Sequence, residues 1–195
     1  MIEQVVVMPR WAGTPADDWY PWLEGALAEW SGRVRVLELP DRGAPRIERC
    51  VAAIEAAVAD AALGSTLLVG HSVGCQAMLR FLAARPAGVA AAGTVCVAGW
   101  WSVDAPWPSI VPWIEAPLAF ERVRAAAGRV TVVLSDDDPF TADHAANAAL
   151  WVERLGAAVR LVPGGRHFNG AVEPAVLAAL ADYGVEGSPT YQSGR

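Results

Sequence analysis

Residues 68–75 read LVGHSVGC, in which Gly70, Ser72 and Gly74 have the spacing G-x-S-x-G. This spacing occurs where a strand turns sharply into a helix and lifts a serine hydroxyl above a sheet. The apolar run before it predicts a buried strand, and the helical pattern after it covers 73–84. The two glycines permit close approach of strand and helix at the turn. A glycine-flanked strand–helix connection also occurs in α/β proteins generally, so the rest of the chain must decide what the serine does.

Working outward from this stretch, short β-branched runs alternate with longer helical patterns. The predicted strands are 4–8, 33–39, 65–70, 91–99, 129–135 and 157–163. The predicted helices are 19–30, 47 to about 64, 73–84, 118–127, 142–155 and 173–183. Helices that separate successive strands indicate parallel β-α-β units. The fold class is therefore α/β, a three-layer sandwich with a mainly parallel, roughly six-stranded sheet.

One segment interrupts this alternation. Residues 100–117 contain four tryptophans and four prolines and fit neither a helical nor a strand period. No linker or internal repeat divides the chain, so we predict a single domain over 1–184. The last residues, 185–195, predict a loosely ordered tail.

Composition excludes several classes of protein. Hydrophobic residues make up 54% of the chain and charged residues 18%, with a formal charge of −6. The absence of a basic cluster argues against a nucleic-acid partner, and the absence of lysine excludes Schiff-base and Walker-type mechanisms. No apolar run approaches the roughly 18 residues of a membrane span, and the N-terminus lacks a basic region, so we expect a cytoplasmic protein. The three cysteines lie in apolar surroundings and predict buried free thiols.

A serine nucleophile needs a base, and the chain contains three histidines. His71 lies beside Ser72 in the turn, where the backbone direction turns its side chain away. His144 lies on a predicted helix and is interpreted as a surface residue. His167 follows the last predicted strand in a glycine-rich loop, at the sheet edge where α/β proteins bind ligands. The histidine that fits by position is therefore His167.

The orienting acid should lie between the serine and the histidine, after a strand. Asp136, Asp137 and Asp138 follow the strand 129–135. We select Asp138, with Asp137 as the reserve and Asp104 as a weaker alternative. Three adjacent carboxylates also suit a helix N-terminus or a metal site, but no second carboxylate cluster is present to complete a metal site. We therefore expect no metal and no cofactor.

The remaining catalytic parts are an oxyanion hole and a substrate pocket. The backbone N–H of Val73, the residue after the nucleophile, is one predicted oxyanion donor, and the N–H of Trp11 is the other. The tryptophans of the interrupting segment follow a strand on the expected side of the sheet. They either form an acyl pocket or cover the core: Trp100, Trp101, Trp107 and Trp113.

Four motifs together resemble the small serine hydrolases of the retinoblastoma-binding protein nine type. They are PADDWYPWL (15–23), GHSVG (70–74), DDDPF (136–140) and GGRHFN (164–169). The resemblance covers nearly the whole chain and implies a minimal α/β-hydrolase fold that cleaves esters or amides. It also implies the roles of nucleophile for Ser72, acid for Asp138 and base for His167. The chain departs from the family at Arg10, where glycine usually follows the proline.

These observations predict a serine hydrolase that cleaves a carboxylic ester of a small-molecule acyl substrate through an acyl-enzyme on Ser72. An acyltransferase or a thioesterase would use the same triad. A non-catalytic protein-interaction module on a hydrolase scaffold is the alternative from another class, with tryptophans around the cleft as its contact surface.

Overall fold

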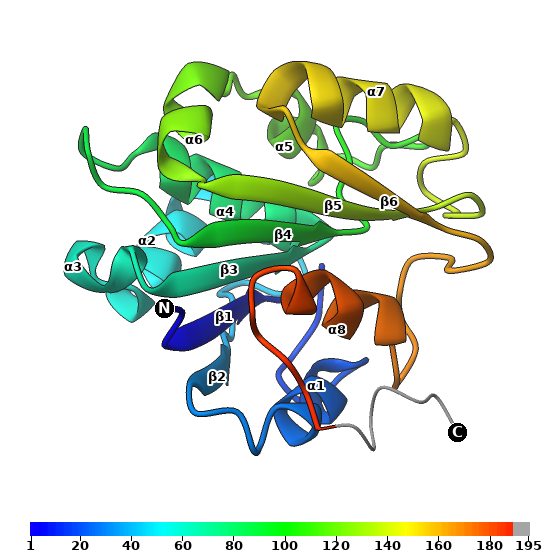
Figure 1. Cartoon of the computed structure of the whole chain (residues 1–195). Coiled ribbons are helices and arrows are strands. Elements are labelled where there is room, and N and C mark those ends of the chain that lie inside the picture. The colour runs from blue at the N-terminus through cyan, green and yellow to red at the C-terminus, as the bar shows by residue number, and fades with distance from the viewer. Residues whose placement is uncertain (189–195) are drawn as a thin grey trace.

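The structure of the chain is a computed structural model that describes residues 1–188 (Figure 1). All six strands are parallel and form one sheet in the order β2-β1-β3-β4-β5-β6. The strands are β1 (Gln4–Met8), β2 (Arg33–Val36), β3 (Thr66–His71), β4 (Gly93–Val97), β5 (Arg129–Ser135) and β6 (Ala158–Val162). The predicted α/β architecture with a six-stranded parallel sheet is confirmed.

Helices cover both faces of this sheet. They are α1 (Tyr20–Ala26), α2 (Ile47–Ala57), α3 (Asp60–Leu63), α4 (Val73–Ala83), α5 (Val111–Glu115), α6 (Phe120–Ala126), α7 (His144–Leu155) and α8 (Pro174–Ala181). On one face α1 and α8 bury Leu23 and Leu180, and on the other α2 and α4 bury Ile54 and Met78 (Figure 1). Each face of the sheet therefore has its own apolar layer, which makes the fold a three-layer sandwich.

Burial along the strands explains why the sheet could be recognised in the sequence. Every residue of the central strand β3 is buried, and its sequence is a nearly continuous apolar run. The edge strands β2 and β6 are partly exposed and carry arginines. This is the pattern of a parallel sheet that is covered on both faces.

Several predicted elements are shorter in the structure: the helix 19–30 corresponds to α1, the strand 33–39 to β2 and the strand 91–99 to β4. The helix predicted from 47 to about 64 ends at Ala57, because Val58 has extended backbone (φ −126°, ψ 105°) and buries its side chain. A separate short helix, α3, follows it. The irregular segment 100–117 contains the single-turn helix α5, which has Pro112 in its first turn, where proline is tolerated.

The C-terminal residues that the structure describes pack against the domain. Val185 is fully buried, and the Ser188 N–H donates to the carbonyl oxygen of Ala26 at 3.0 Å. The rest of the predicted tail, 189–195, lies outside the described residues. Within residues 1–188, no helix is both long enough and apolar enough to cross a bilayer. The three cysteines are buried free thiols, as predicted.

The carboxyl ends of the strands lie in register at one edge of the sheet. Met8 is paired with Gly70, His71 with Val97, and Ser135 with Val162. The loops that follow β1, β3, β4, β5 and β6 therefore leave the sheet together. These loops carry the predicted site residues.

Candidate active site

Ser72 occupies the sharp turn between β3 and α4. Its backbone has φ 55° and ψ −118°, a conformation that is costly for a residue other than glycine. The turn is held by two backbone hydrogen bonds: the Ser72 N–H donates to Val97 O at 2.9 Å, and the Cys75 N–H donates to Ser72 O at 2.9 Å. Strained backbone of this kind persists where the surrounding structure fixes it, and it is concentrated at functional sites.

The glycines that flank the serine are required by packing. A Cβ atom on Gly74 would lie 2.1 Å from the carbonyl oxygen of Met8, and one on Gly70 would lie 2.6 Å from the Cα of Cys75. Both contacts are with backbone atoms, which cannot rotate away. The glycines therefore allow the start of α4 to approach β1 and β3 closely, as the sequence predicts.

Asp138 and His167 come together from the loops after β5 and β6. Their Oδ2 and Nδ1 atoms are 2.8 Å apart, and both side chains are buried. The other carboxylate oxygen of Asp138 accepts the Phe140 N–H at 2.9 Å. An ionised carboxylate only accepts hydrogen bonds, so Nδ1 of His167 carries the proton and Nε2 is left as an acceptor.

The other two aspartates of the run hold the histidine loop through its backbone. Asp137 accepts the Ser135 hydroxyl and the Arg166 N–H, each at 2.6 Å, and these two bonds lower the pKa of its carboxyl. Asp136 accepts the Gly164 N–H at 2.9 Å. Of the three carboxylates, the one that contacts the imidazole is Asp138.

The remaining alternatives of the sequence analysis lie elsewhere. Asp104 accepts the Ala142 N–H at 2.8 Å in an exposed position. His144 begins α7, where its Nδ1 is buried without a hydrogen-bond partner among the described residues. Neither residue lines the cavity that contains Ser72.

A cavity of about 310 Å³ opens over Ser72 and His167. Its wall is formed mostly by aromatic and aliphatic side chains: Arg10, Trp11, Ser72, Trp100, Val103, Trp107, Ile110, Phe140, His167 and Asn169. The Ser72 hydroxyl oxygen accepts the indole N–H of Trp100 at 3.3 Å. An indole N–H only donates, so this contact leaves the hydroxyl proton of Ser72 free for another acceptor on the cavity wall.

The four tryptophans of the segment 100–117 divide into two pairs. Trp100 and Trp107 line the cavity. Trp101 instead packs against the ring of Trp151 at 4.5 Å between centroids. Trp113, in α5, donates its indole N–H to the carbonyl oxygen of Pro45 at 2.9 Å and is almost fully buried. Of the two alternatives left open by the sequence, Trp101 and Trp113 therefore follow the second: they cover the core and do not line this cavity.

A series of edge-to-face aromatic contacts runs along the cavity wall. Trp11 contacts Trp107 at 5.2 Å, Trp107 contacts Phe140 at 6.4 Å, and Phe140 contacts the His167 ring at 4.7 Å. Phe140 and Asn169 are cavity residues that were not predicted from the sequence. Their only signal was their position, two residues after Asp138 and His167 respectively.

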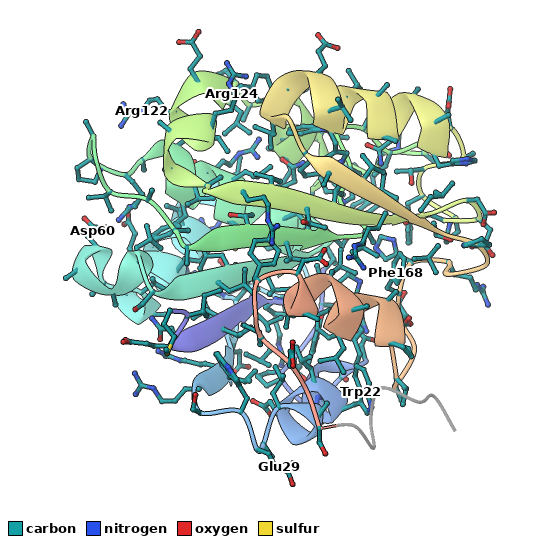
Figure 2. The ribbon with its side chains drawn as sticks, in the orientation of Figure 1. Trp22, Glu29, Asp60, Arg122, Arg124 and Phe168 are labelled. Carbon is teal, nitrogen blue, oxygen red and sulfur yellow. The ribbon has the colours of Figure 1, made fainter. Side chains whose placement is uncertain are left out.

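The side chain of Phe168 anchors the loop that carries His167. This side chain is fully buried against the layer that contains α8, and Figure 2 shows it inside the molecule, whereas Glu29 and Arg122 lie at the periphery. Phe168 has a φ of 53°, and Arg166, two residues before it, has a φ of 49°. The loop therefore turns tightly on both sides of His167.

The predicted oxyanion donors are the backbone N–H groups of Trp11, which lines the cavity, and of Val73, which follows Ser72; neither has an acceptor within the described part of the chain. Val73 is the first residue of α4, where the helix dipole favours negative charge. Arg10 braces the loop of Trp11: its guanidinium pairs with both carboxylate oxygens of Asp18, at 2.5 and 3.0 Å, and donates to Trp11 O at 2.9 Å. The paired carboxylate raises the pKa of Arg10. These donors can stabilise an oxyanion formed beside Ser72.

The family model described as serine hydrolase matches residues 5–173, which include the sharp turn at Ser72 and the loops of Asp138 and His167. The chain belongs to the serine hydrolase family. One relative is YdeN of Bacillus subtilis (strain 168), which is 24% identical to this chain over 173 residues. The alignment covers 86% of this chain and 87% of YdeN.

Solved structures with the same fold include the crystal structure of the ydeN gene product, with a TM-score of 0.82 and 23% sequence identity. The match covers 94% of this serine hydrolase and 100% of that chain. Another is Est1E from Butyrivibrio proteoclasticus with ferulic acid bound, with a TM-score of 0.68 and 12% identity over 93% and 88% of the two chains. Both likenesses concern the α/β-hydrolase fold.

Proposed function

We propose that this serine hydrolase cleaves carboxylic esters through an acyl-enzyme on Ser72, with His167 as base and Asp138 as the orienting acid. The observation that carries the proposal is a shared cavity wall: Ser72, on its strained turn, and His167, held by Asp138 at 2.8 Å, line the same cavity. Nucleophile, acid and base, as Ser72, Asp138 and His167, follow one another in the chain order of α/β-hydrolases.

The reaction proceeds in two halves. Nε2 of His167 takes the hydroxyl proton as Ser72 Oγ attacks the acyl carbonyl, and the buried Asp138 carboxylate stabilises the imidazolium. The N–H groups of Val73 and Trp11 bind the oxyanion of the tetrahedral intermediate. His167 then protonates the leaving alcohol, and the acyl group remains on Ser72. A water molecule, deprotonated by His167, releases the acid and regenerates the serine.

The cavity favours a compact apolar or aromatic acyl group. Its volume of about 310 Å³ lies at the lower end of the range for ligand pockets. Trp100, Trp107 and Phe140 present ring surfaces to it. Aromatic rings pack well edge-to-face or offset against such walls, so an arylacyl ester of the size of a ferulate, the ligand bound by Est1E, is a suitable test substrate.

We further place the chain with the retinoblastoma-binding protein nine type, on the motifs DDDPF (136–140) and GGRHFN (164–169). We retain the interpretation of one catalytic domain acting in the cytoplasm on a small molecule, and extend it beyond residue 184 to include the packed residues 185–188. The acidic net charge of −6 supports a partner other than nucleic acid.

A fluorophosphonate probe tests the proposal directly. The native protein should react covalently, and Ser72→Ala should not react. Ser135→Ala is the matched control, since Ser135 is buried at the same edge of the sheet but bonds Asp137 rather than lining the cavity. Equal labelling of native protein and Ser72→Ala would refute the nucleophile. A native protein that folds but neither labels nor cleaves p-nitrophenyl esters would favour the non-catalytic module, and faster turnover of thioesters would favour a thioesterase.

A further inference from the structure

His71, the residue before Ser72, lies at the centre of a buried hydrogen-bond chain. Its Nδ1 is 2.8 Å from the hydroxyl of Tyr20, and its Nε2 is 2.9 Å from the backbone carbonyl oxygen of His167. The Tyr20 hydroxyl in turn accepts the backbone N–H of Arg10 at 3.0 Å. These four residues come from four separate segments of the chain.

The chemistry of the partners fixes the direction of every bond in the chain. A carbonyl oxygen only accepts, so Nε2 of His71 carries the proton and donates to His167 O. Nδ1 of the neutral ring is then an acceptor, and it receives the Tyr20 hydroxyl proton. The Tyr20 oxygen is left to accept the Arg10 N–H. No alternative arrangement satisfies all three bonds with a neutral ring.

Burial keeps both side chains in these protonation states. Burial lowers the pKa of His71 well below its ordinary value, and the neighbouring His167 lowers it further. Burial likewise raises the pKa of Tyr20. Trp19 packs over both rings, at 4.7 Å from Tyr20 and 5.7 Å from His71, and His71 and Tyr20 are fully buried. No bulk water can replace a lost partner there, so each broken bond leaves an unpaired polar group.

This hydrogen-bond chain joins the three parts of the proposed catalytic site. The Arg10 N–H belongs to the residue before Trp11, a proposed oxyanion donor. His71 precedes Ser72, the proposed nucleophile. The accepting carbonyl belongs to His167, the proposed base. The sheet pairs β1 directly with β3, but β6, which leads to His167, is separated from β3 by two strands, so the sheet does not connect the His167 loop directly to Ser72.

We propose that His71 and Tyr20 are positioning residues. They hold the loop of Trp11, the proposed oxyanion donor, and the loop of His167 in place relative to Ser72. This inference rests on the proposed function, because it assigns what those loops must align. Neither side chain lines the cavity, so neither touches the substrate. Their effect is transmitted through the backbone of the loops that do.

Tyr20→Phe tests the end of the hydrogen-bond chain that reaches Arg10 and the loop of Trp11. The substitution removes the Tyr20 hydroxyl and keeps the ring. Tyr183→Phe is the matched control: its hydroxyl bonds the Thr131 side chain at 2.9 Å and the carbonyl oxygens of Thr94 and Arg129, both at 3.1 Å, and lies away from the cavity. Both variants should lower the melting temperature. We express kcat on p-nitrophenyl acetate per active site, with the sites counted by fluorophosphonate titration. Only Tyr20→Phe should lower this kcat, by about tenfold, and its KM should stay within about twofold of the native value.

Variants of His71 test both sides of the chain together. His71→Phe removes both ring nitrogens and should lower kcat by about 10²-fold or more. His71→Gln keeps an amide that can donate to His167 O and accept from Tyr20, so it should recover part of that loss. A structural role alone would make kcat per titrated site equal in all folded variants.

The outcomes separate this inference from the proposed function. A Tyr20→Phe protein that loses thermal stability like Tyr183→Phe but keeps its full kcat would overturn the positioning role, even if Ser72→Ala is inactive. Activity that survives in Ser72→Ala would instead refute the nucleophile. If His71→Phe does not fold, the comparison of Tyr20→Phe with Tyr183→Phe decides the question by itself.

Discussion

Oδ2 of Asp138 lies 2.8 Å from Nδ1 of His167, with 4% and 7% of the two side chains exposed. At this burial the pair is shielded from bulk water, so its geometry is set by the protein. Asp138 is itself fixed by the Phe140 N–H at its other oxygen. The imidazole is therefore held in one tautomer before any substrate arrives, which is the condition for general-base catalysis by Nε2.

Asp138→Asn should reduce kcat by about 10³- to 10⁴-fold, because an amide in this position can no longer enforce the Nδ1-protonated tautomer. Steady-state hydrolysis of p-nitrophenyl acetate measures the effect. The binding of substrate is not altered by this change, so KM should stay within a few-fold of the native value.

Asp137→Asn is the matched control for that variant. Asp137 is the neighbouring carboxylate and bonds the backbone N–H of Arg166 rather than the imidazole. Its replacement should lower kcat by less than about tenfold. If Asp137→Asn were the more damaging of the two, the acid would have been assigned to the wrong member of the run.

A second prediction concerns Gly74 in the sharp turn between β3 and α4. Gly74→Ala would place a Cβ atom 2.1 Å from the carbonyl oxygen of Met8, and the backbone there cannot move without displacing β1. Overpacking of this kind should cost about 3 kcal/mol or more, which for a domain of this size lowers the melting temperature by roughly 6–12 °C. Gly43→Ala is the control, since nothing lies within 4 Å of its added Cβ. Thermal unfolding followed by circular dichroism would contradict the packing role if the two variants melted together.

The sheet and the candidate triad could be predicted because their signals are local. The buried strand β3 is an apolar run in the sequence, and Ser72, Asp138 and His167 each follow a strand closely. Position after a strand is enough to place a residue at the ligand-binding edge of a parallel sheet. It does not determine the direction of a side chain in an irregular loop.

The parts that could not be predicted depend on contacts that are distant in sequence. Trp113 is oriented by α5 and by the carbonyl of Pro45, 68 residues away, so its place in the core left no local pattern. His71 finds Tyr20 and His167 at separations of 51 and 96 residues. The backbone direction in the turn predicts that the His71 side chain points away from Ser72, but no local pattern in the sequence indicates these partners.

The aromatic wall gives a third prediction, on acyl preference. Trp107 lines the cavity and contacts both Trp11 and Phe140, so Trp107→Ala should open the wall and admit longer chains. Across p-nitrophenyl esters from acetate to octanoate, the ratio of kcat/KM for octanoate over acetate should rise by about tenfold or more. Trp113→Phe, a change in the core beyond the cavity, should leave that ratio unchanged. The wall would have no role in selection if the two variants gave the same profile.

The fourth prediction follows from the buried neutral state of His71. Its pKa in the folded protein lies well below 6.5, its ordinary value, through burial and then the proximity of His167 and Arg10. Below about pH 6.5 the unfolded chain therefore binds a proton at this position that the folded protein does not. The stabilisation is complete above that pH and is lost as the pH falls toward the folded-state value.

Between about pH 7.5 and 5.5, this difference should lower the free energy of unfolding more in the native protein than in His71→Gln, by on the order of 1 kcal/mol, because glutamine has no group to protonate there. Urea unfolding at the two pH values measures it. Groups distant from position 71 titrate alike in both proteins, so their contributions cancel when the two differences are compared. Identical pH dependence in the two proteins would mean that His71 takes up its proton in the folded state. The Tyr20 hydroxyl could then no longer donate to Nδ1, and the buried hydrogen-bond chain would be broken in weakly acidic solution.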